Sequence, residues 1–278
     1  MTISRGSDAS STARLLQRPE GRLAFTVHGE GLPVVLLPGM GDIQSTYRFL
    51  APALVAAGYR AITMDLRGHG DSDATFSSYD NESAAGDLVA LVEQVGGPAV
   101  LVGNSMGAAA AVIAAATHPD LVTGLVLIGP FVRDPHVGRL TRAMVRVMMA
   151  PAWAGAMWRS YLPKLYAGQR PDDFDAHRDA VSQALKKPGH ARAFSRTTRT
   201  SHAPAEALID KVVAPSLVVM GADDPDFPDP RAEAAWIAAH LGSEVLIVDD
   251  AGHYPQSQRP EVVSPAVVGF AHRITSRA

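Results

Sequence analysis

The chain has 278 residues, of which 47% are hydrophobic and 19% charged, with a formal net charge of −3 and no cysteine. This length favours one main α/β domain with insertions, and the composition excludes a disordered chain. The charge provides no basic surface for nucleic acid. The lack of cysteine excludes disulfides, zinc-thiolate and iron–sulfur sites, and a thiol nucleophile.

The first 21 residues mix serine, arginine and aspartate and lack the apolar stretch of a signal peptide, so we expect a flexible leader at 1–21. The longest apolar run, at 107–117, is too short to cross a bilayer and predicts a buried helix. We therefore expect a cytoplasmic protein whose partner is a small-molecule substrate, with no nucleic acid and no membrane. The sequence does not indicate an oligomeric state.

Short apolar runs alternate with helical patterns along the chain. Residues 23–27 alternate weakly and predict an edge strand, whereas 34–37 are continuously apolar, as in a strand covered on both faces. Helices are predicted at 47–57, at 82–95, and from Asp229, where a capping carboxylate precedes a proline. Further strands are predicted at 61–64, 99–102, 121–128, 217–220 and 245–248. This order predicts α/β architecture with a mainly parallel, doubly wound sheet.

The stretch at 131–214 carries long helical patterns and no convincing strand. We interpret it as a helical cap or lid inserted into a core made of 22–130 and 215–278. Its flexible apolar and aromatic side chains suit a cover over a pocket. The predicted substrate-binding residues are Met144, Met148, Trp153, Met157, Trp158 and Tyr161.

One serine stands at a predicted strand-to-helix turn. Residues 103–107 read Gly-Asn-Ser-Met-Gly, follow the strand at 99–102 and open a run of small residues. Glycines two positions before and after Ser105 leave room for a sharp turn that exposes the hydroxyl. The helix that follows would direct free N–H groups at a developing oxyanion. The pattern indicates a nucleophile.

Together with three further segments, this turn resembles an α/β-hydrolase from residue 22 to residue 273. Residues 221–224 and 251–254 follow later strands in the family's order, and 37–41 stand where the family has its oxyanion loop. The resemblance implies an α/β-hydrolase sheet with a helical cap and a catalytic triad of Ser105, Asp224 and His253. It also implies an oxyanion hole made by the backbone N–H groups of Met40 and Met106.

A serine hydroxyl attacks a carbonyl only if a base takes its proton, and an imidazole base needs a carboxylate to fix its tautomer. His253 is the candidate base, and Asp224 matches the family's G-x-x-D pattern. The alternatives for the acid are Asp223, Asp226, Asp229 and Asp134.

His69 lies between two glycines in a stretch that resembles a family signature, so we expect a structural role rather than a second base. Pro38 replaces the histidine that usually precedes the family's loop glycine. No metal is predicted, because metal-ligand spacing is absent at the remaining histidines, which include His118, His136, His190 and His202.

A serine at this turn argues against epoxide-hydrolase and dehalogenase chemistry, which needs a carboxylate nucleophile. We expect hydrolysis of a carboxylic ester, lactone or thioester of a small to medium, largely apolar substrate through an acyl-enzyme, without a cofactor. A carbon–carbon bond hydrolase or a cofactor-free perhydrolase would use the same residues, although the carbon–carbon cleaving relatives carry a longer glycine-rich loop than 38–42. A non-catalytic ligand-binding protein is the alternative from another class.

Overall fold

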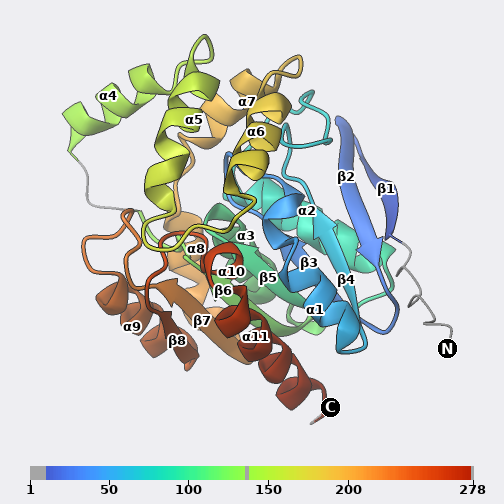
Figure 1. The fold of residues 1–278 in the computed structure, drawn as a ribbon. Helices are drawn as coiled ribbons and strands as arrows, with labels where there is room; N and C mark the ends of the chain where they lie inside the picture. Colours follow the sequence, from blue (N-terminus) through green and yellow to red (C-terminus); the bar gives the residue numbers. More distant parts are fainter. Residues whose placement is uncertain (1–10, 135–137, 277–278) are drawn as a thin grey trace, which may run out of the picture.

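A computed structural model describes residues 11–134 and 138–276 of the chain. Its sheet has eight strands in the order β1-β2-β4-β3-β5-β6-β7-β8 (Figure 1). The β1–β2 and β2–β4 pairs are antiparallel and the other neighbouring pairs are parallel, so the prediction of a mainly parallel sheet is confirmed. The strands are β1 (Ser11–Arg18), β2 (Gly21–His28), β3 (Leu32–Leu37), β4 (Tyr59–Met64), β5 (Ala99–Asn104), β6 (Val122–Ile128), β7 (Ser216–Gly221) and β8 (Glu244–Val248).

Helices cover both faces of this sheet, which confirms the doubly wound arrangement (Figure 1). Alternate residues of the buried strands point to opposite faces, and each face has its own apolar cluster. One cluster includes residues of α2 (Asn81–Gln94), α3 (Met106–Thr117) and α9 (Pro230–Leu241), and the other includes residues of α1 (Leu50–Ala56) and α11 (Pro260–Thr275).

Of two predicted helix starts, one agrees with the structure and the other does not. Helix α9 begins as predicted, because the Asp229 carboxylate accepts a hydrogen bond of 3.0 Å from the Ala232 N–H. The single helix predicted at 47–57 is instead a 3₁₀ turn (Gln44–Tyr47) followed by α1. Pro52 has no N–H and is best tolerated in the first turn of an α-helix, which agrees with the start of α1 at Leu50.

The N-terminal prediction is wrong for residues 11–18, which form strand β1 rather than part of a flexible leader. This strand pairs with β2 along its whole length, buries Leu16 and joins Arg18 to Asp87 at 2.9 Å. Residues 1–10 lie outside the described part. The strand predicted at 23–27 is not at the edge, because β1 covers it on one side and β4 on the other. The exposed side chains of β1 are mostly polar, so its sequence lacks the apolar run that would predict a strand.

Between β6 and β7, the described residues form five α-helices and no strand. They are α4 (Arg139–Met148), α5 (Ala154–Leu165), α6 (Phe174–Leu185), α7 (His190–Thr197) and α8 (Ala203–Leu208). We call α4 to α7 the cap helices, and Figure 1 shows them gathered beyond one end of the sheet. An apolar cluster of their own includes Trp158, Phe174 and Phe194, and Tyr254 joins it from the core. The predicted domain boundaries stay a prediction.

Within 11–134 and 138–276, no helix combines the length and the apolar character needed to span a membrane. The small connecting elements are the 3₁₀ turns Pro119–Leu121 and Ile209–Lys211 and the helix α10 (Pro255–Gln258).

Candidate active site

Ser105 lies between the end of β5 and the start of α3, in a backbone conformation with φ 56° and ψ −119°. Non-glycine residues rarely adopt this region, and it costs of order 1–3 kcal/mol, which the surrounding structure must offset. A Cβ on Gly103 would lie 2.3 Å from the Gly107 carbonyl oxygen, and one on Gly107 would lie 2.4 Å from the Leu37 carbonyl oxygen. Both glycines are therefore required by close backbone approach, as the sequence pattern indicates.

His253 and Asp224 form a buried pair at the ends of β8 and β7, respectively. The Nδ1 atom of His253 lies 2.7 Å from Oδ2 of Asp224, and both side chains are almost completely buried. The Asp224 Oδ1 atom accepts a hydrogen bond of 3.0 Å from the Asp226 N–H, which fixes the carboxylate. The Nδ1–H of His253 can therefore donate to Asp224, leaving Nε2 as the atom that accepts a proton.

Two residues connect His253 to the serine turn. The Asn104 side-chain amide donates to the His253 carbonyl at 3.2 Å and to the Ile128 carbonyl at 3.0 Å. The Phe131 N–H donates to the Ser105 carbonyl at 3.4 Å, and the Phe131 ring lies edge-on to the His253 ring with centroids 5.8 Å apart. These contacts hold the histidine loop and the serine turn at the same edge of the sheet.

The charges around His253 favour its protonated form. Burial by itself opposes the charge, but the adjacent carboxylate of Asp224, with smaller contributions from Asp226 and Asp42, raises the pKa of His253 to about 9. Asp226 is a second carboxylate, with Oδ2 3.9 Å from His253 Nδ1. Burial raises the pKa of Asp226, while the facing imidazole opposes that shift.

The predicted oxyanion loop lies directly against the serine. A Cβ on Gly39 would be 2.6 Å from the Ser105 Cβ, so only glycine allows this approach. Among the described residues, the Met40 N–H has no hydrogen-bond acceptor. The Met106 N–H belongs to the first turn of α3, where an α-helix offers no internal acceptor. Both donors that the resemblance implies are thus available at this edge.

Gly41, the next residue of the loop, is held from both sides. Its N–H donates to Nε2 of His69 at 2.9 Å, while the other ring nitrogen of His69 lies 2.9 Å from the Arg67 carbonyl. Burial lowers the pKa of His69 to about 4, so the ring is neutral and can accept. The Gly41 carbonyl accepts a bond of 2.6 Å from the indole N–H of Trp158 in α5. His69 therefore has the structural role expected of it.

Two of the predicted lid residues contact the catalytic elements through hydrogen bonds. Trp158 is buried and bonded to the oxyanion loop, and the Tyr161 hydroxyl donates to Oδ1 of Asp226 at 2.8 Å. Helix α5 thus touches both the loop that would bind the oxyanion and the carboxylate beside His253. Tyr161 and Asp226 are more than 60 residues apart in the sequence, so no local sequence pattern could predict their contact.

The structure also shows a buried aspartate–histidine contact that the sequence patterns did not predict. Asp42, which follows the loop glycine, lies 2.9 Å from Nε2 of His177 in α6, with both side chains buried. Burial would raise the pKa of Asp42, but the attraction of the facing His177 and the hydrogen bonds from His177, Ile43 and Thr46 together lower it. The four residues from Gly39 to Asp42 are therefore fixed by two cap helices as well as by the core.

The other predicted lid residues lie away from these contacts. Met144, Met148 and Trp153 have large exposed fractions, and Met157 is half-buried. The Trp153 indole donates at 3.0 Å to the Val147 carbonyl, within its own part of the cap. No described contact joins these four side chains to Ser105, Asp224 or His253.

The remaining candidate acids have structural positions. Asp223 is exposed, Asp229 caps α9, and Asp134 accepts hydrogen bonds from the Ser201 hydroxyl and the His202 N–H. Asp224 is the acid that contacts Nδ1 of His253 at hydrogen-bond distance, and Asp226 stands next to it. His136, one of the histidines weighed for metal binding, lies outside the described residues.

Asp224, Asp226 and His253 also place one ligand atom each within 4.8 Å of one another, a donor set that could hold a cation. The Nδ1 atom that would bind an ion at this point is already engaged with Asp224 at 2.7 Å. The arrangement fits an imidazole oriented for proton transfer.

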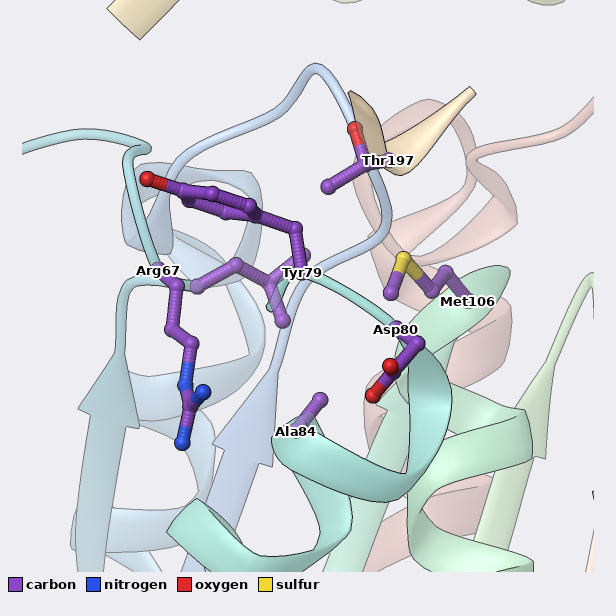
Figure 2. A pocket seen from close by; sticks show the side chains of 7 residues that line it. Arg67, Tyr79, Asp80, Ala84, Met106 and Thr197 are labelled. Atoms are coloured by element: carbon purple, nitrogen blue, oxygen red, sulfur yellow. The ribbon is translucent and has the colours of Figure 1, made fainter. Parts of the chain in front are cut away.

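A small cavity lies behind the serine turn, and Figure 2 shows the side chains around it. Its lining includes Met106, with Asp80 and Ala84 at the start of α2. The Met106 side chain is buried in the core beside this cavity, and only its backbone N–H belongs to the predicted oxyanion hole. A larger groove between α1 and strands β2 and β4 is lined by none of Ser105, Asp224 and His253.

Comparison with known proteins agrees with the fold. A sequence profile described as the alpha/beta hydrolase family matches residues 34–266. A Mycobacterium tuberculosis protein named as a non-heme bromoperoxidase is 30% identical over 275 residues, covering 89% of this chain and 97% of its own. A 2-hydroxy-6-oxononadienedioate/2-hydroxy-6-oxononatrienedioate hydrolase of Dechloromonas aromatica is 27% identical, covering 97% and 98%. The structure of a thermophilic esterase from Thermogutta terrifontis superposes with a TM-score of 0.81 at 24% identity, covering 96% of this chain and 99% of that one. The chain therefore belongs to the alpha/beta hydrolase family and is an enzyme of that family.

Proposed function

We propose that this enzyme is a serine hydrolase that cleaves a carboxylic ester, lactone or thioester through an acyl-enzyme. The observation that carries the proposal is the buried His253–Asp224 pair, 2.7 Å apart, at the sheet edge where Ser105 occupies its strained turn. A histidine oriented by a carboxylate beside such a serine is the arrangement that nucleophilic acyl transfer needs.

In the proposed mechanism, the Ser105 Oγ adds to the acyl carbon while His253 Nε2 takes its proton. Asp224 stabilises the imidazolium that forms. The backbone N–H groups of Met40 and Met106 bind the oxyanion, and each such donor is typically worth roughly 3 kcal/mol in the transition state. His253 then protonates the leaving group, activates a water molecule, and the acid is released by the reverse sequence of steps. No step requires a cofactor.

The surroundings of His253 support a largely apolar substrate of small to medium size. The Phe131 ring packs on His253 and on Phe227, whose ring centroid is 4.7 Å away. Trp158 and Tyr161, which pack on each other with centroids 5.9 Å apart, stand on the cap side. Aromatic side chains around a few fixed polar groups are typical of sites for uncharged small molecules. A small-molecule substrate, no nucleic-acid partner and a cytoplasmic location belong to the same proposal.

Covalent labelling tests the nucleophile. A fluorophosphonate should label the purified protein on Ser105, and Ser105→Ala should abolish the labelling. Asp224→Asn, which keeps the shape of the acid, should slow labelling by orders of magnitude, because the histidine loses its tautomer control. A native protein that binds ligands but is never labelled would instead favour the non-catalytic alternative.

The acyl specificity is tested with p-nitrophenyl esters of increasing chain length. We expect kcat/KM to increase from acetate to a medium-length chain. Equal or better turnover of small, highly charged esters would contradict the apolar site.

Perhydrolysis is the second candidate, because the 30% identical relative is named a bromoperoxidase. In this reaction hydrogen peroxide replaces water at the acyl-enzyme and a peracid leaves. Peracid formation that outpaces hydrolysis at millimolar peroxide would favour it. Carbon–carbon bond hydrolysis, the reaction of the Dechloromonas relative, is tested in parallel with a diketone substrate.

A further inference from the structure

Helix α4 differs from every other cap helix because its apolar side chains are not covered. Each described side chain from 140 to 148 is exposed, with exposed fractions of 85% at Leu140 and 64% at Val147. A helix of a folded domain usually turns its apolar stripe toward its own core. Figure 1 shows α4 at the outer end of the cap, away from the sheet.

The sequence of this helix separates apolar from basic positions. Apolar residues recur at 140, 144, 147 and 148, whereas arginines recur at 139, 142 and 146. At 100° per residue these two sets occupy different sides of the helix. The helix is therefore strongly amphipathic although the apolar side chains at 140, 144, 147 and 148 are all exposed.

The stretch of sequence that contains this helix carries charge of one sign. From residue 138 to residue 171 the sequence contains six basic residues and no acidic one. Arg146 is exposed in the last turn of α4, and the half-exposed Trp153 follows shortly after it, bonded to the Val147 carbonyl. Apolar side chains, arginines and an adjoining tryptophan are the composition of helices that lie in a lipid interface.

We propose that α4 is a docking helix for an anionic lipid surface. Its apolar side would enter the acyl boundary, and its basic side, which carries the exposed Arg146, would face the negative headgroups. A second copy of the chain fits less well, because a twofold contact through α4 would bring two basic helices together. The expectation of no membrane partner came from the absence of a spanning segment, and a helix in the interface plane needs no such length.

The test uses the full-length protein and sedimentation with sucrose-loaded vesicles at low salt. Vesicles of phosphatidylglycerol should bind the protein, and vesicles of phosphatidylcholine should bind it far more weakly. Val147→Asp should lower the partition coefficient at least roughly tenfold, since it places a charge in the apolar boundary. The matched control is Val213→Asp, at a 78% exposed valine before β7, which should bind like the unmodified protein.

The arginine contribution has its own pair of variants. Near an anionic surface each charge changes binding by about fivefold, so Arg146→Glu should weaken it by roughly 25-fold. Arg14→Glu, at an exposed arginine of β1, should have little effect. The tryptophan emission should shift to shorter wavelength on phosphatidylglycerol vesicles, and this shift should disappear in Trp153→Phe while sedimentation persists.

Equal binding to neutral and anionic vesicles would overturn the proposal, and so would no binding to either. A dimer in light scattering that Val147→Asp dissociates, without vesicle binding, would assign the surface to a second copy. Ser105→Ala should bind vesicles as the unmodified protein does, so vesicle binding tests the docking surface independently of the proposed hydrolase activity.

Discussion

The indole of Trp158 provides the sharpest test of how the cap supports the oxyanion loop. Trp158→Phe keeps an aromatic ring in the buried cluster and removes the N–H that donates to the Gly41 carbonyl at 2.6 Å. Leaving a buried acceptor without its partner costs about 1–3 kcal/mol. If the loop moves to relieve this cost, the Met40 N–H leaves its position beside Ser105.

The expected loss follows from those magnitudes. Because 1.4 kcal/mol corresponds to a factor of ten, kcat should fall by roughly 5- to 100-fold with KM changed little. The ceiling is the complete loss of one oxyanion donor, which costs roughly 10²- to 10³-fold. The assay is the steady-state hydrolysis of the best p-nitrophenyl ester, with the inhibition constant of a trifluoromethyl ketone measured in parallel. The affinity for this transition-state analogue should fall by the same factor as kcat.

The matched control is Trp236→Phe, in α9 of the core and outside the cap, where the ring packs against Arg133 and His240. It should leave kcat and the inhibition constant unchanged. The reasoning is refuted if Trp158→Phe lowers the melting temperature but leaves both quantities at the control level, because the bond would then stabilise the fold alone.

Four further outcomes are expected. The imidazole of His253 must be neutral to act as a base, and its pKa is raised to about 9. We therefore expect kcat/KM to increase with pH until about pH 9. A plateau of kcat/KM reached by pH 6.5 would contradict this expectation. The same raised pKa stabilises the fold below pH 6.5 and this contribution is lost as the pH rises through 9, so the melting temperature should decline where activity rises. Asp226→Asn keeps an acceptor for the Tyr161 hydroxyl and removes a charge near His253. The rising limb of the pH profile of kcat/KM should therefore move to lower pH. If the limb stays at the same pH, Asp226 has a purely structural role. Gly107→Ala should lower the free energy of unfolding in urea by roughly 3 kcal/mol or more, because its Cβ would meet the Leu37 carbonyl at 2.4 Å. The control Gly86→Ala, in the open middle of α2, should instead stabilise the protein by up to about 1 kcal/mol. A similar effect of both substitutions would exclude the backbone clash as the cause.

Local sequence patterns predicted most strands of the sheet. Continuous apolar runs located β3 and β5, because strands buried on both faces carry mostly apolar side chains. They did not locate β1, whose exposed side chains are mostly polar and which is ordered by its backbone pairing with β2. Trp158 and Tyr161 were assigned to substrate contact from composition, and the structure bonds them to Gly41 and Asp226.

The sequence by itself located the serine turn, since the five residues around Ser105 form a local pattern in which Gly103 meets the nearby Gly107 carbonyl, whereas the need for Gly107 comes from the distant Leu37 carbonyl. Tertiary structure decided which carboxylate faces His253 and which residues hold the oxyanion loop. The partners of that loop are His69, Trp158 and His177, which come from three separate segments of the chain. Such contacts depend on how helices pack against a sheet, and packing at long sequence separation leaves no periodic signal in the residues that take part.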